Sequence, residues 1–284
     1  MSKQQIVYLN GKFLQIKNAK ISVLDRGFLF GDGVYEVIPI YNGSAVGLRE
    51  HLERLQHSLD AIKISLKIDV KTFESIFKSL LEKNSATTGA YSIYLQITRG
   101  AASERGQAFP KEITPTIFAI TKAIPPLSYE TLRHGKSAVT HEDIRWKYCH
   151  IKSISLLPTL LLFDKAVEAN ADETILIRNG YALEGTSSNV FIVEKGIIFT
   201  PPLSEENLSG VTRNLILKLA RENNFVLREE EILKDRLFSA DEVWISSSSR
   251  GIFPIVKLDG KIIGNGKPGK IWDRMIKLYI NQTR

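Results

Sequence analysis

Residues 143–157 read DIRWKYCHIKSISLL, and the second of the two lysines in this stretch, Lys152, lies among isoleucines and leucines. Desolvation disfavours the charged form of a lysine in such surroundings. A neutral lysine amine is a nucleophile that forms Schiff bases with aldehydes. Most lysines are nevertheless solvated surface charges, so this stretch alone leaves both interpretations of Lys152 open.

The composition predicts a globular enzyme in a reducing compartment. The 284 residues suffice for one large or two medium domains, and 43% of them are hydrophobic and 24% charged. The net charge of +7 is spread over the whole chain, which does not favour nucleic-acid binding. The longest apolar run, ISLLPTLLLF, is too short to span a bilayer. The single cysteine, Cys149, excludes an intrachain disulfide, and we expect a cytoplasmic protein.

Four Asn-Gly or Asp-Gly pairs lie between runs rich in β-branched and aromatic residues. They are found in VYLNGKF, IPIYNGSAVGL, ILIRNGYAL and IVKLDGKII. Such pairs favour the positive φ angles of two-residue hairpin turns. Two pairs precede the chain midpoint and two follow it, so the sequence predicts antiparallel sheet in both halves rather than a parallel βαβ architecture.

Helical periodicity and one proline pair predict the remaining organisation. Apolar residues recur at helical spacing in residues 49–62, 70–83, 157–169, 211–223 and 268–280. Pro125 and Pro126 forbid helix and stiffen a connection. We therefore expect a smaller domain over residues 1–121, a linker over 122–130 and a larger domain over 131–284.

Other stretches contain polar residues suited to binding an anionic, nitrogen-containing ligand. Glu184, in LEGTSSNVFIV, is either a turn residue or a carboxylate that keeps a heteroaromatic nitrogen protonated. The stretch LSGVTRN is either an ordinary helix cap or a helix start that binds phosphate. Ser246–Ser249 form a polar loop or an anion cradle, and Arg54 is a surface charge or a phosphate ligand. The histidines lack metal-ligand spacing, so we expect no metal site.

Taken in order, these stretches resemble the class IV aminotransferases, the fold-type IV group of pyridoxal-phosphate enzymes. The resemblance covers nearly the whole chain and is strongest to D-amino acid aminotransferases. The matching stretches are DRGFLFGDGVYEV at 25–37, EHLERL at 50–55, TRG at 98–100, EDIRWKYCHIKSISLL at 142–157, LEGTSSNVF at 183–191, LSGVTRN at 208–214 and SSSS at 246–249. It implies an α+β fold with a smaller N-terminal α/β sandwich and a larger C-terminal barrel-like domain. In this family the cofactor lies between the domains, and a homodimer completes the substrate pocket.

The resemblance also implies a role for each matched residue. Lys152 would form the Schiff base with pyridoxal 5′-phosphate and then shuttle a proton, while Glu184 would pair with the pyridinium nitrogen. Tyr35 would line the substrate side near the lysine. The residues expected to hold the phosphate or pack on the ring are Arg54, Leu208, Val211, Thr212, Ser247 and Ser248.

One segment departs from the family pattern. D-amino acid aminotransferases clamp the substrate carboxylate with an arginine and a histidine two positions apart, and here Arg105 and Gln107 stand in those places. Because glutamine still donates a hydrogen bond, we expect carboxylate binding to persist. The resemblance then implies transfer of the amino group of a D-amino acid, such as D-alanine, to 2-oxoglutarate. A 4-amino-4-deoxychorismate lyase and a branched-chain L-amino acid aminotransferase are the alternatives on the same fold. A serine hydrolase is disfavoured because the chain contains no G-x-S-x-G motif.

Overall fold

The computed structural model describes residues 4–283, and the chain divides into two compact units. The first unit holds the residues up to Pro125 together with Ile151–Leu156, and the second holds Pro126–His150 and the residues from Leu157 onward. The division falls inside the stretch 122–130 that the sequence predicts as a linker. Residues 1–3 and 284 of the predicted domains lie outside the described part of the chain.

All four hairpins predicted from Asn-Gly and Asp-Gly pairs are present. The paired strands are β1 (Ile6–Leu9) with β2 (Lys12–Gln15), β3 (Gly33–Tyr41) with β4 (Ser44–Ala45), β8 (Glu173–Arg178) with β9 (Tyr181–Gly185), and β15 (Gly251–Leu258) with β16 (Lys261–Ile262). Both central residues of each turn have positive φ, for example 47° at Asn10 and 85° at Gly11. Turns of this kind match the right-handed twist of the flanking strands, which is why these sequence pairs specify the hairpins.

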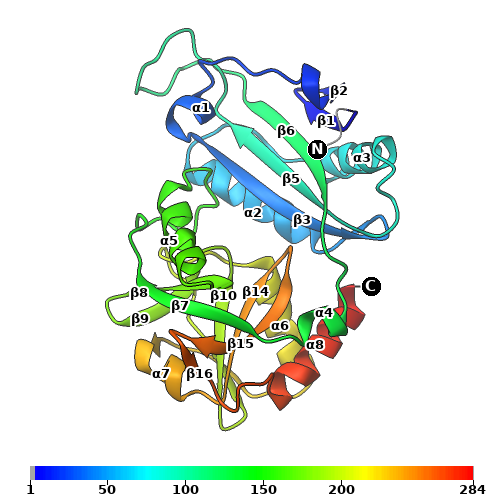
Figure 1. Ribbon diagram of the computed structural model, residues 1–284. Helices are drawn as coiled ribbons and strands as arrows, with labels where there is room; N and C mark the ends of the chain where they lie inside the picture. The colour runs from blue at the N-terminus through cyan, green and yellow to red at the C-terminus, as the bar shows by residue number, and fades with distance from the viewer. Residues whose placement is uncertain (1–3, 284) are drawn as a thin grey trace. The chain divides into compact units, whose positions relative to one another are not determined.

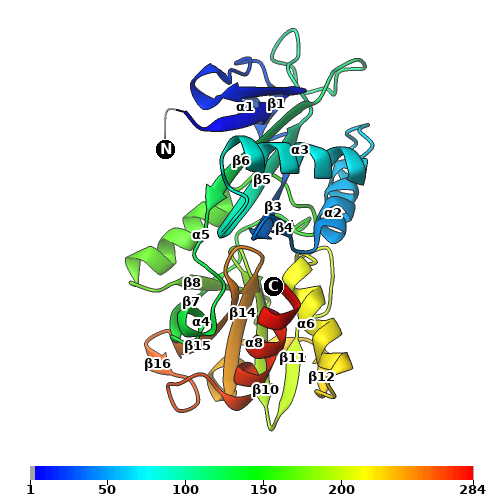
Figure 2. The same cartoon turned by 90° about the vertical axis from the view of Figure 1, so that its right-hand side faces the viewer.

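The first unit is a six-stranded antiparallel sheet covered by two helices (Figures 1 and 2). The strand order is β2-β1-β6-β5-β3-β4, with β5 at Ala90–Thr98 and β6 at Thr116–Ala123. Helices α2 (Leu48–Ala61) and α3 (Val70–Lys83) contribute Leu52, Leu55, Leu59, Phe73 and Phe77 to one core with the sheet. Each fully buried leucine contributes about 1.5–3 kcal/mol to that packing. The short helices η1 (Ile16–Asn18) and α1 (Arg26–Phe30) complete the unit.

The segment Ile151–Leu156 joins the first unit by extending its sheet. Strand β4 pairs only with the last residues of β3, at Ile40 and Tyr41. The same edge of β3 is therefore open near Val34, where Ser153 forms an antiparallel bridge. The sequence places this segment in the later domain, and the structure differs because backbone pairing to a distant strand leaves no local sequence pattern.

The second unit contains a ten-stranded sheet of mixed direction. Its order is β12-β11-β10-β14-β15-β7-β8-β9-β13, and β16 pairs with β15. Most neighbours are antiparallel, but β7 runs parallel to β8 and β15, and β11 runs parallel to β12. The remaining strands are β7 (Lys136–Glu142), β10 (Asn189–Glu194), β11 (Ile197–Thr200), β12 (Leu227–Glu229), β13 (Ile232–Leu233) and β14 (Glu242–Ser247).

Both faces of this sheet are buried. Phe191 and Trp244 pack in a core with helices α6 (Val211–Glu222) and α8 (Lys270–Thr283), whereas their neighbours Ile192 and Ile245 pack in a second core on the other face. This division follows from the two-residue period of a strand. The helices of the unit are α4 (Tyr129–Leu132), α5 (Leu157–Glu168), α6 (Val211–Glu222), α7 (Lys234–Ser239) and α8 (Lys270–Thr283). The five long helices of the two units confirm the five periodic segments of the sequence to within a few residues.

Candidate active site

Lys152 lies half-buried beside Tyr35. Its ammonium nitrogen Nζ is 4.4 Å from the centre of the Tyr35 ring. The Lys152 carbonyl accepts a hydrogen bond from the Tyr35 amide at 3.0 Å, and the Lys152 amide donates to the Ser58 hydroxyl on α2 at 3.2 Å. The backbone of the lysine is thus fixed between β3 and α2, and a cation–π contact restrains its side chain.

Arg54 belongs to a buried charge network in the same unit. Its Nε and Nη2 donate to the two carboxylate oxygens of Glu36, each at 2.7 Å. His51 Nδ1 lies 2.7 Å from the same carboxylate, and neither Glu36 nor His51 is exposed. Burial favours a higher pKa for Glu36, but Arg54 and His51 outweigh it and hold that pKa at about 2. The predicted phosphate ligand is therefore oriented by a carboxylate that the sequence analysis did not identify.

Glu184 in the second unit is buried and held by three donors. Its Oε1 accepts from Arg145 Nη1 at 2.7 Å. Its Oε2 accepts from the Leu208 backbone N–H at 3.0 Å and from the Asn189 side chain at 3.4 Å. Burial raises the pKa of the Glu184 carboxyl, and Arg145 and the Leu208 N–H oppose that rise. Because a carboxylate offers about four acceptor positions, Glu184 keeps the capacity to accept one further N–H bond.

A second carboxylate fixes Arg145. Asp143 accepts from Arg145 Nε and Nη2, each at 2.9 Å, and from Arg178 Nη2 at 2.8 Å. The Asp143 carboxylate is fully buried. Burial disfavours the charged form of Arg145, but Glu184 and Asp143 together raise its pKa above its ordinary value. The arginine is therefore a fixed positive charge next to Glu184.

The start of α6 has the features of an anion-binding helix terminus. Val211 and Thr212 form its first turn, and the preceding Gly210 has no side chain to cap their N–H groups. A Cβ atom at Gly210 would collide with the Asn189 side-chain oxygen, so a larger residue would require Asn189 to move. Within residues 4–283, the buried Ser246 hydroxyl has no hydrogen-bond partner. The close approach of the Gly210 backbone to the Asn189 side chain and the unbonded Ser246 hydroxyl are features expected of residues that bind a phosphorylated ring.

Ser247 is the last residue of β14 and Ser248 follows it, and both are half-buried. Arg250 joins their loop to a neighbouring turn, since its Nε lies 3.4 Å from the Ser247 hydroxyl and its Nη2 donates to the Ser187 hydroxyl at 2.9 Å. The same Nη2 donates to the fully buried carboxylate of Glu173 at 2.6 Å. The serine loop is thus held by an ion pair that the sequence analysis did not identify.

Arg105 and Gln107 are exposed on the loop between β5 and β6. The Arg105 guanidinium lies 5.0 Å from the centre of the Phe30 ring. The structure places these two residues, like Lys152, Tyr35 and Arg54, in the first unit, and it places the other predicted site residues in the second unit.

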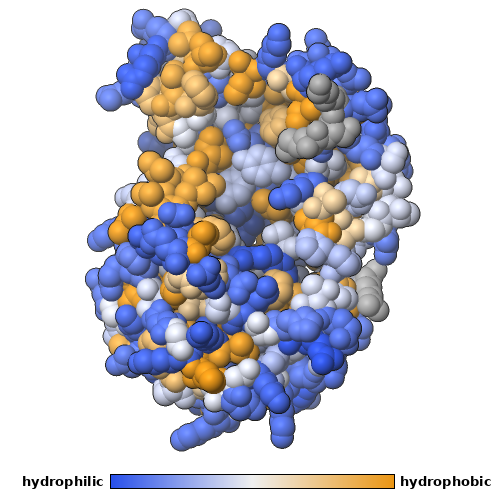
Figure 3. Space-filling model, viewed as in Figure 1, coloured by the Kyte–Doolittle hydropathy of each residue, from blue (hydrophilic) through white to orange (hydrophobic). Residues whose placement is uncertain are grey.

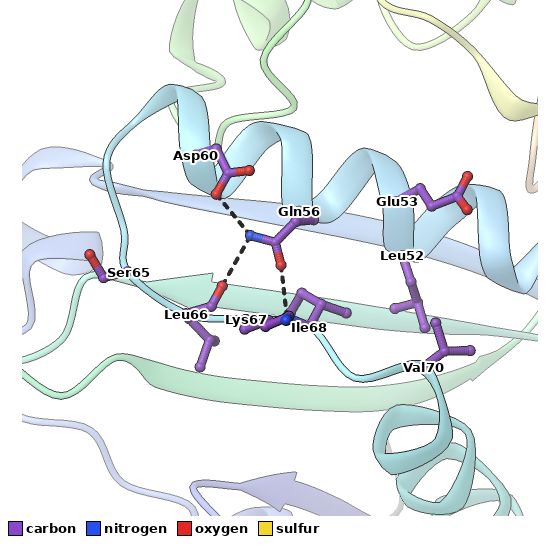
Figure 4. A pocket seen from close by; sticks show the side chains of 9 residues that line it. All are labelled: Leu52, Glu53, Gln56, Asp60, Ser65, Leu66, Lys67, Ile68 and Val70. Carbon is purple, nitrogen blue, oxygen red and sulfur yellow. Dashed lines mark hydrogen bonds between the residues drawn. The ribbon is translucent and has the colours of Figure 1, made fainter.

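A pocket of about 640 Å³ opens on a face of α2 that does not carry Arg54 (Figure 4). The Gln56 side chain lines this pocket and forms hydrogen bonds with the Asp60 side chain, the Leu66 carbonyl and the Ile68 amide. Gln56 and Asp60 are on the side of α2 opposite to Arg54, as their helical spacing requires. The pocket is lined by Leu52, Glu53, Gln56, Asp60, Ser65, Leu66, Lys67, Ile68 and Val70, and these do not include the predicted site residues.

Residues 4–283 contain no cluster of His, Cys, Asp and Glu side chains arranged to hold a metal ion. None of the helices described there is both long and apolar enough to cross a membrane.

Comparison with known protein families identifies the scaffold. A model of the family described as "Amino-transferase class IV" matches residues 33–258. The chain belongs to the class IV aminotransferases. The matched range contains every predicted site residue, from Tyr35 to Ser248, and the family resemblance seen in the sequence is confirmed.

Curated relatives and solved structures agree with this assignment. The chain is 42% identical over 266 residues to a protein of Staphylococcus aureus (strain N315) named D-alanine aminotransferase, covering 93% of each chain. It is 40% identical over 265 residues to the D-alanine aminotransferase of Bacillus licheniformis, covering 93% of this chain and 92% of the relative. The branched-chain amino acid aminotransferase of Escherichia coli superposes with a TM-score of 0.91 at 26% identity, covering 98% and 94% of the two chains. The predicted α+β, fold-type IV architecture is therefore confirmed.

The residues that sequence reasoning missed are mostly charged partners. Arg145 and Asp143 lie inside the opening stretch, where a charged pair beside an apolar run is an available but weak signal. Glu36 occupies an inward position of an apolar strand, between Val34 and Ile38, and such a carboxylate needs a buried partner. The partner of each charged residue is determined by the tertiary structure, so the sequence alone does not identify it.

Proposed function

We propose that this protein is a pyridoxal-phosphate-dependent transaminase that moves the amino group of a D-amino acid, D-alanine in particular, to 2-oxoglutarate. The observation that carries the proposal is its identity of 40–42% to proteins named D-alanine aminotransferase over 93% of the chain. The amino group is transferred in two half-reactions, so steady-state kinetics should be ping-pong.

The residues of the second unit suit the cofactor of this family. When bound, pyridoxal phosphate supplies an electron sink for the negative charge left when the substrate Cα loses its proton. Glu184 would accept a hydrogen bond from the N–H of the protonated cofactor ring, and Arg145 orients that carboxylate and opposes the rise in its pKa that burial causes. The first turn of α6 and the serines at 246–248 offer N–H and hydroxyl donors for the phosphate. Leu208 is held by its own backbone bond to Glu184, and its side chain would pack on the ring.

The residues of the first unit suit proton transfer. Lys152 Nζ would hold the cofactor covalently and, once released, take the proton from the substrate Cα. Tyr35 lies against that nitrogen and limits the positions it reaches. Arg54 would place a positive charge next to the phosphate. The two hydrogen bonds that Arg54 donates to Glu36 fix the plane of its guanidinium.

Arg105 and Gln107 would bind the substrate carboxylate. Arg105→Ala should raise KM for D-alanine by about 10- to 100-fold, because a hydrogen bond to a charged group contributes about 1.5–3 kcal/mol. The cofactor content should stay unchanged. The exposed neighbour Glu104 gives a matched control, since Glu104→Ala should leave KM as it is. Loss of cofactor from the Arg105 variant would contradict this role.

A substrate panel decides among the activities of this fold. We expect D-alanine with 2-oxoglutarate to give pyruvate and glutamate faster than L-leucine reacts with the same acceptor. The branched-chain alternative has specific support, since solved structural neighbours carry that name, and equal or faster turnover of L-leucine would favour it. Pyruvate release from 4-amino-4-deoxychorismate without an amino acceptor would favour the lyase.

We further propose that the protein is a homodimer and that the exposed face of α5 contributes to the interface. Leu157, Leu160, Leu161 and Val167 are each more than half exposed on this helix. Figure 3 shows apolar side chains gathered over α5. An apolar patch of this kind is typical of a protein interface, and a second copy of the chain is the partner that the family implies.

Light scattering coupled to size-exclusion chromatography tests the dimer. The wild-type protein should have twice the mass of the chain, and Leu160→Glu together with Leu161→Glu should give a monomer. Ile262→Glu is the control, because Ile262 is an exposed apolar residue of β16 outside the α5 patch. A monomeric wild type would refute the proposal. We also propose a cytoplasmic location, which the single cysteine supports.

A further inference from the structure

Arg26, on the short helix α1, binds the backbone of the loop that carries Arg105 and Gln107. Its Nη1 donates to the Gly106 carbonyl at 2.6 Å and to the Ala108 carbonyl at 3.3 Å. Its Nη2 donates to the Gln107 carbonyl at 3.3 Å. Arg26 is only 3% exposed, although the residues it binds are exposed. One buried guanidinium therefore fixes three consecutive carbonyls on an exposed loop.

The orientation of Arg26 is itself fixed by a shared carboxylate. Arg26 Nε and Arg99 Nε both donate to Asp32 Oδ2 at 2.7 Å, and Arg99 Nη2 donates to Oδ1 at 3.0 Å. Arg99 also donates to the Ile62 and Lys63 carbonyls after α2. The Asp32–Arg99 pair thus links α1 to the end of α2, and a hydrogen-bonded charge network of this kind favours one geometry.

Aromatic rings and the base of the loop add further restraints. The Arg99 guanidinium lies 3.8 Å from the centre of the Phe109 ring. The Phe30 ring lies 4.8 Å from the Arg26 guanidinium, and Arg105 approaches the same ring. At the base of the loop, the Arg26 amide donates to the Gly100 carbonyl at 2.9 Å. The loop is therefore attached to Arg26 both where it begins and where it carries its functional side chains.

We propose that Arg26 is a positioning residue for substrate carboxylate binding, with Asp32 and Arg99 as its supports. This inference rests on the proposed function, which assigns the carboxylate to Arg105 and Gln107. Arg26 does not contact the substrate. It holds the backbone on both sides of Gln107, so that the two exposed side chains are presented in one arrangement before the substrate arrives.

Arg26→Lys in the holoenzyme tests the proposal. Lysine keeps the positive charge but lacks the planar fork that reaches Asp32 and three carbonyls together. We expect KM for D-alanine to rise by about 10- to 100-fold, the scale of a 1 Å misplacement, while kcat and cofactor content change little. Arg49→Lys, at an exposed arginine of α2, is the matched control and should be silent.

A primary amine without a carboxylate separates positioning from general damage. The single-turnover reaction of this amine with the holoenzyme can be monitored by the decrease in cofactor absorbance. Its rate should be the same in Arg26→Lys and in wild type. A parallel loss of D-alanine turnover, amine reactivity and cofactor content would mean that Arg26 is only structural and would overturn the inference. An unchanged KM for D-alanine would overturn it as well.

Two comparisons distinguish failure of this inference from failure of the proposed function. If Arg105→Ala raises KM and Arg26→Lys does not, only the positioning role is refuted. If Arg105→Ala is silent, the carboxylate assignment fails. Hydrogen exchange in the cofactor-free protein then tests whether Arg26 anchors the loop: the amides of residues 101–109 should exchange faster in Arg26→Lys, with those of β5 unchanged. Equal exchange in the two proteins would refute the anchoring itself.

Discussion

Glu36→Gln removes the charge at the centre of the network that orients Arg54. Glutamine keeps the size of the side chain but cannot accept two bonds from Arg54 and a third from His51. The Arg54 side chain is only 10% exposed, so its charge would lose the ion pair with Glu36 in a largely buried place.

The pKa of Glu36 falls from 4.5 to about 2, which corresponds to about 3 kcal/mol of stability. This stability is fully present above pH 4.5 and is lost as the pH falls toward 2, because the folded protein binds the proton more weakly than the unfolded chain does. Breaking a buried ion pair by mutation costs about 3–5 kcal/mol, which agrees. We therefore expect a loss of about 3 kcal/mol at neutral pH.

Hydrogen exchange is the appropriate assay because Trp146, Trp244 and Trp272 all lie in the second unit, where fluorescence does not report on Glu36. Amides of α2 and β3 in the cofactor-free variant should exchange about 100-fold faster at pH 7, and the difference from wild type should shrink at acid pH. Glu53→Gln, at an exposed position of α2, is the control. Exchange equal to that of wild type at pH 7 would refute the reasoning.

Three further predictions concern the second unit. Gly210→Ala should lower the cofactor affinity of the apoprotein in a spectroscopic titration, because the added Cβ would collide with the Asn189 oxygen; unchanged affinity would contradict this. Arg145→Met should shift the acid limb of the pH–rate profile for D-alanine to higher pH, because burial then raises the pKa of Glu184 without opposition from Arg145. An acid limb at the same pH as in wild type would exclude an effect of Arg145 on the Glu184 pKa. Glu173→Gln should lower the free energy of unfolding of this unit by about 3–5 kcal/mol, measured by tryptophan fluorescence in urea, since Glu173 is fully buried and ion-paired. A loss below about 1 kcal/mol would indicate that solvent reaches the pair.

The local structure of this protein was predictable from sequence because it is encoded by neighbouring residues. Asn10-Gly11 specifies its own turn, and the apolar spacing of residues 49–62 specifies a helix whose observed bounds are Leu48–Ala61. Lys152 and Glu184 were identified as candidates because each is an ionisable residue in an apolar or turn setting, and the family pattern assigned their chemistry.

The supporting charges could not be predicted in the same way. Arg145 bonds Glu184 across 39 positions, and Arg26 bonds the Gln107 carbonyl across 81. A guanidinium that binds backbone carbonyls leaves no trace in the sequence of the loop it holds. The pairing of Ser153 with Val34 is also a tertiary contact, and it transfers the Lys152 segment to the first unit. Sequence patterns therefore indicated the candidate reacting groups, whereas the structure shows which charged residues bond to them.

Borohydride reduction of the holoenzyme followed by peptide mapping tests the central claim most directly. The reduced cofactor should be bound covalently to Lys152 and should be found in the peptide that contains this residue. The same treatment of Lys152→Ala should leave the protein unlabelled. Attachment to any other lysine, or a protein that never takes up pyridoxal phosphate, would contradict the account.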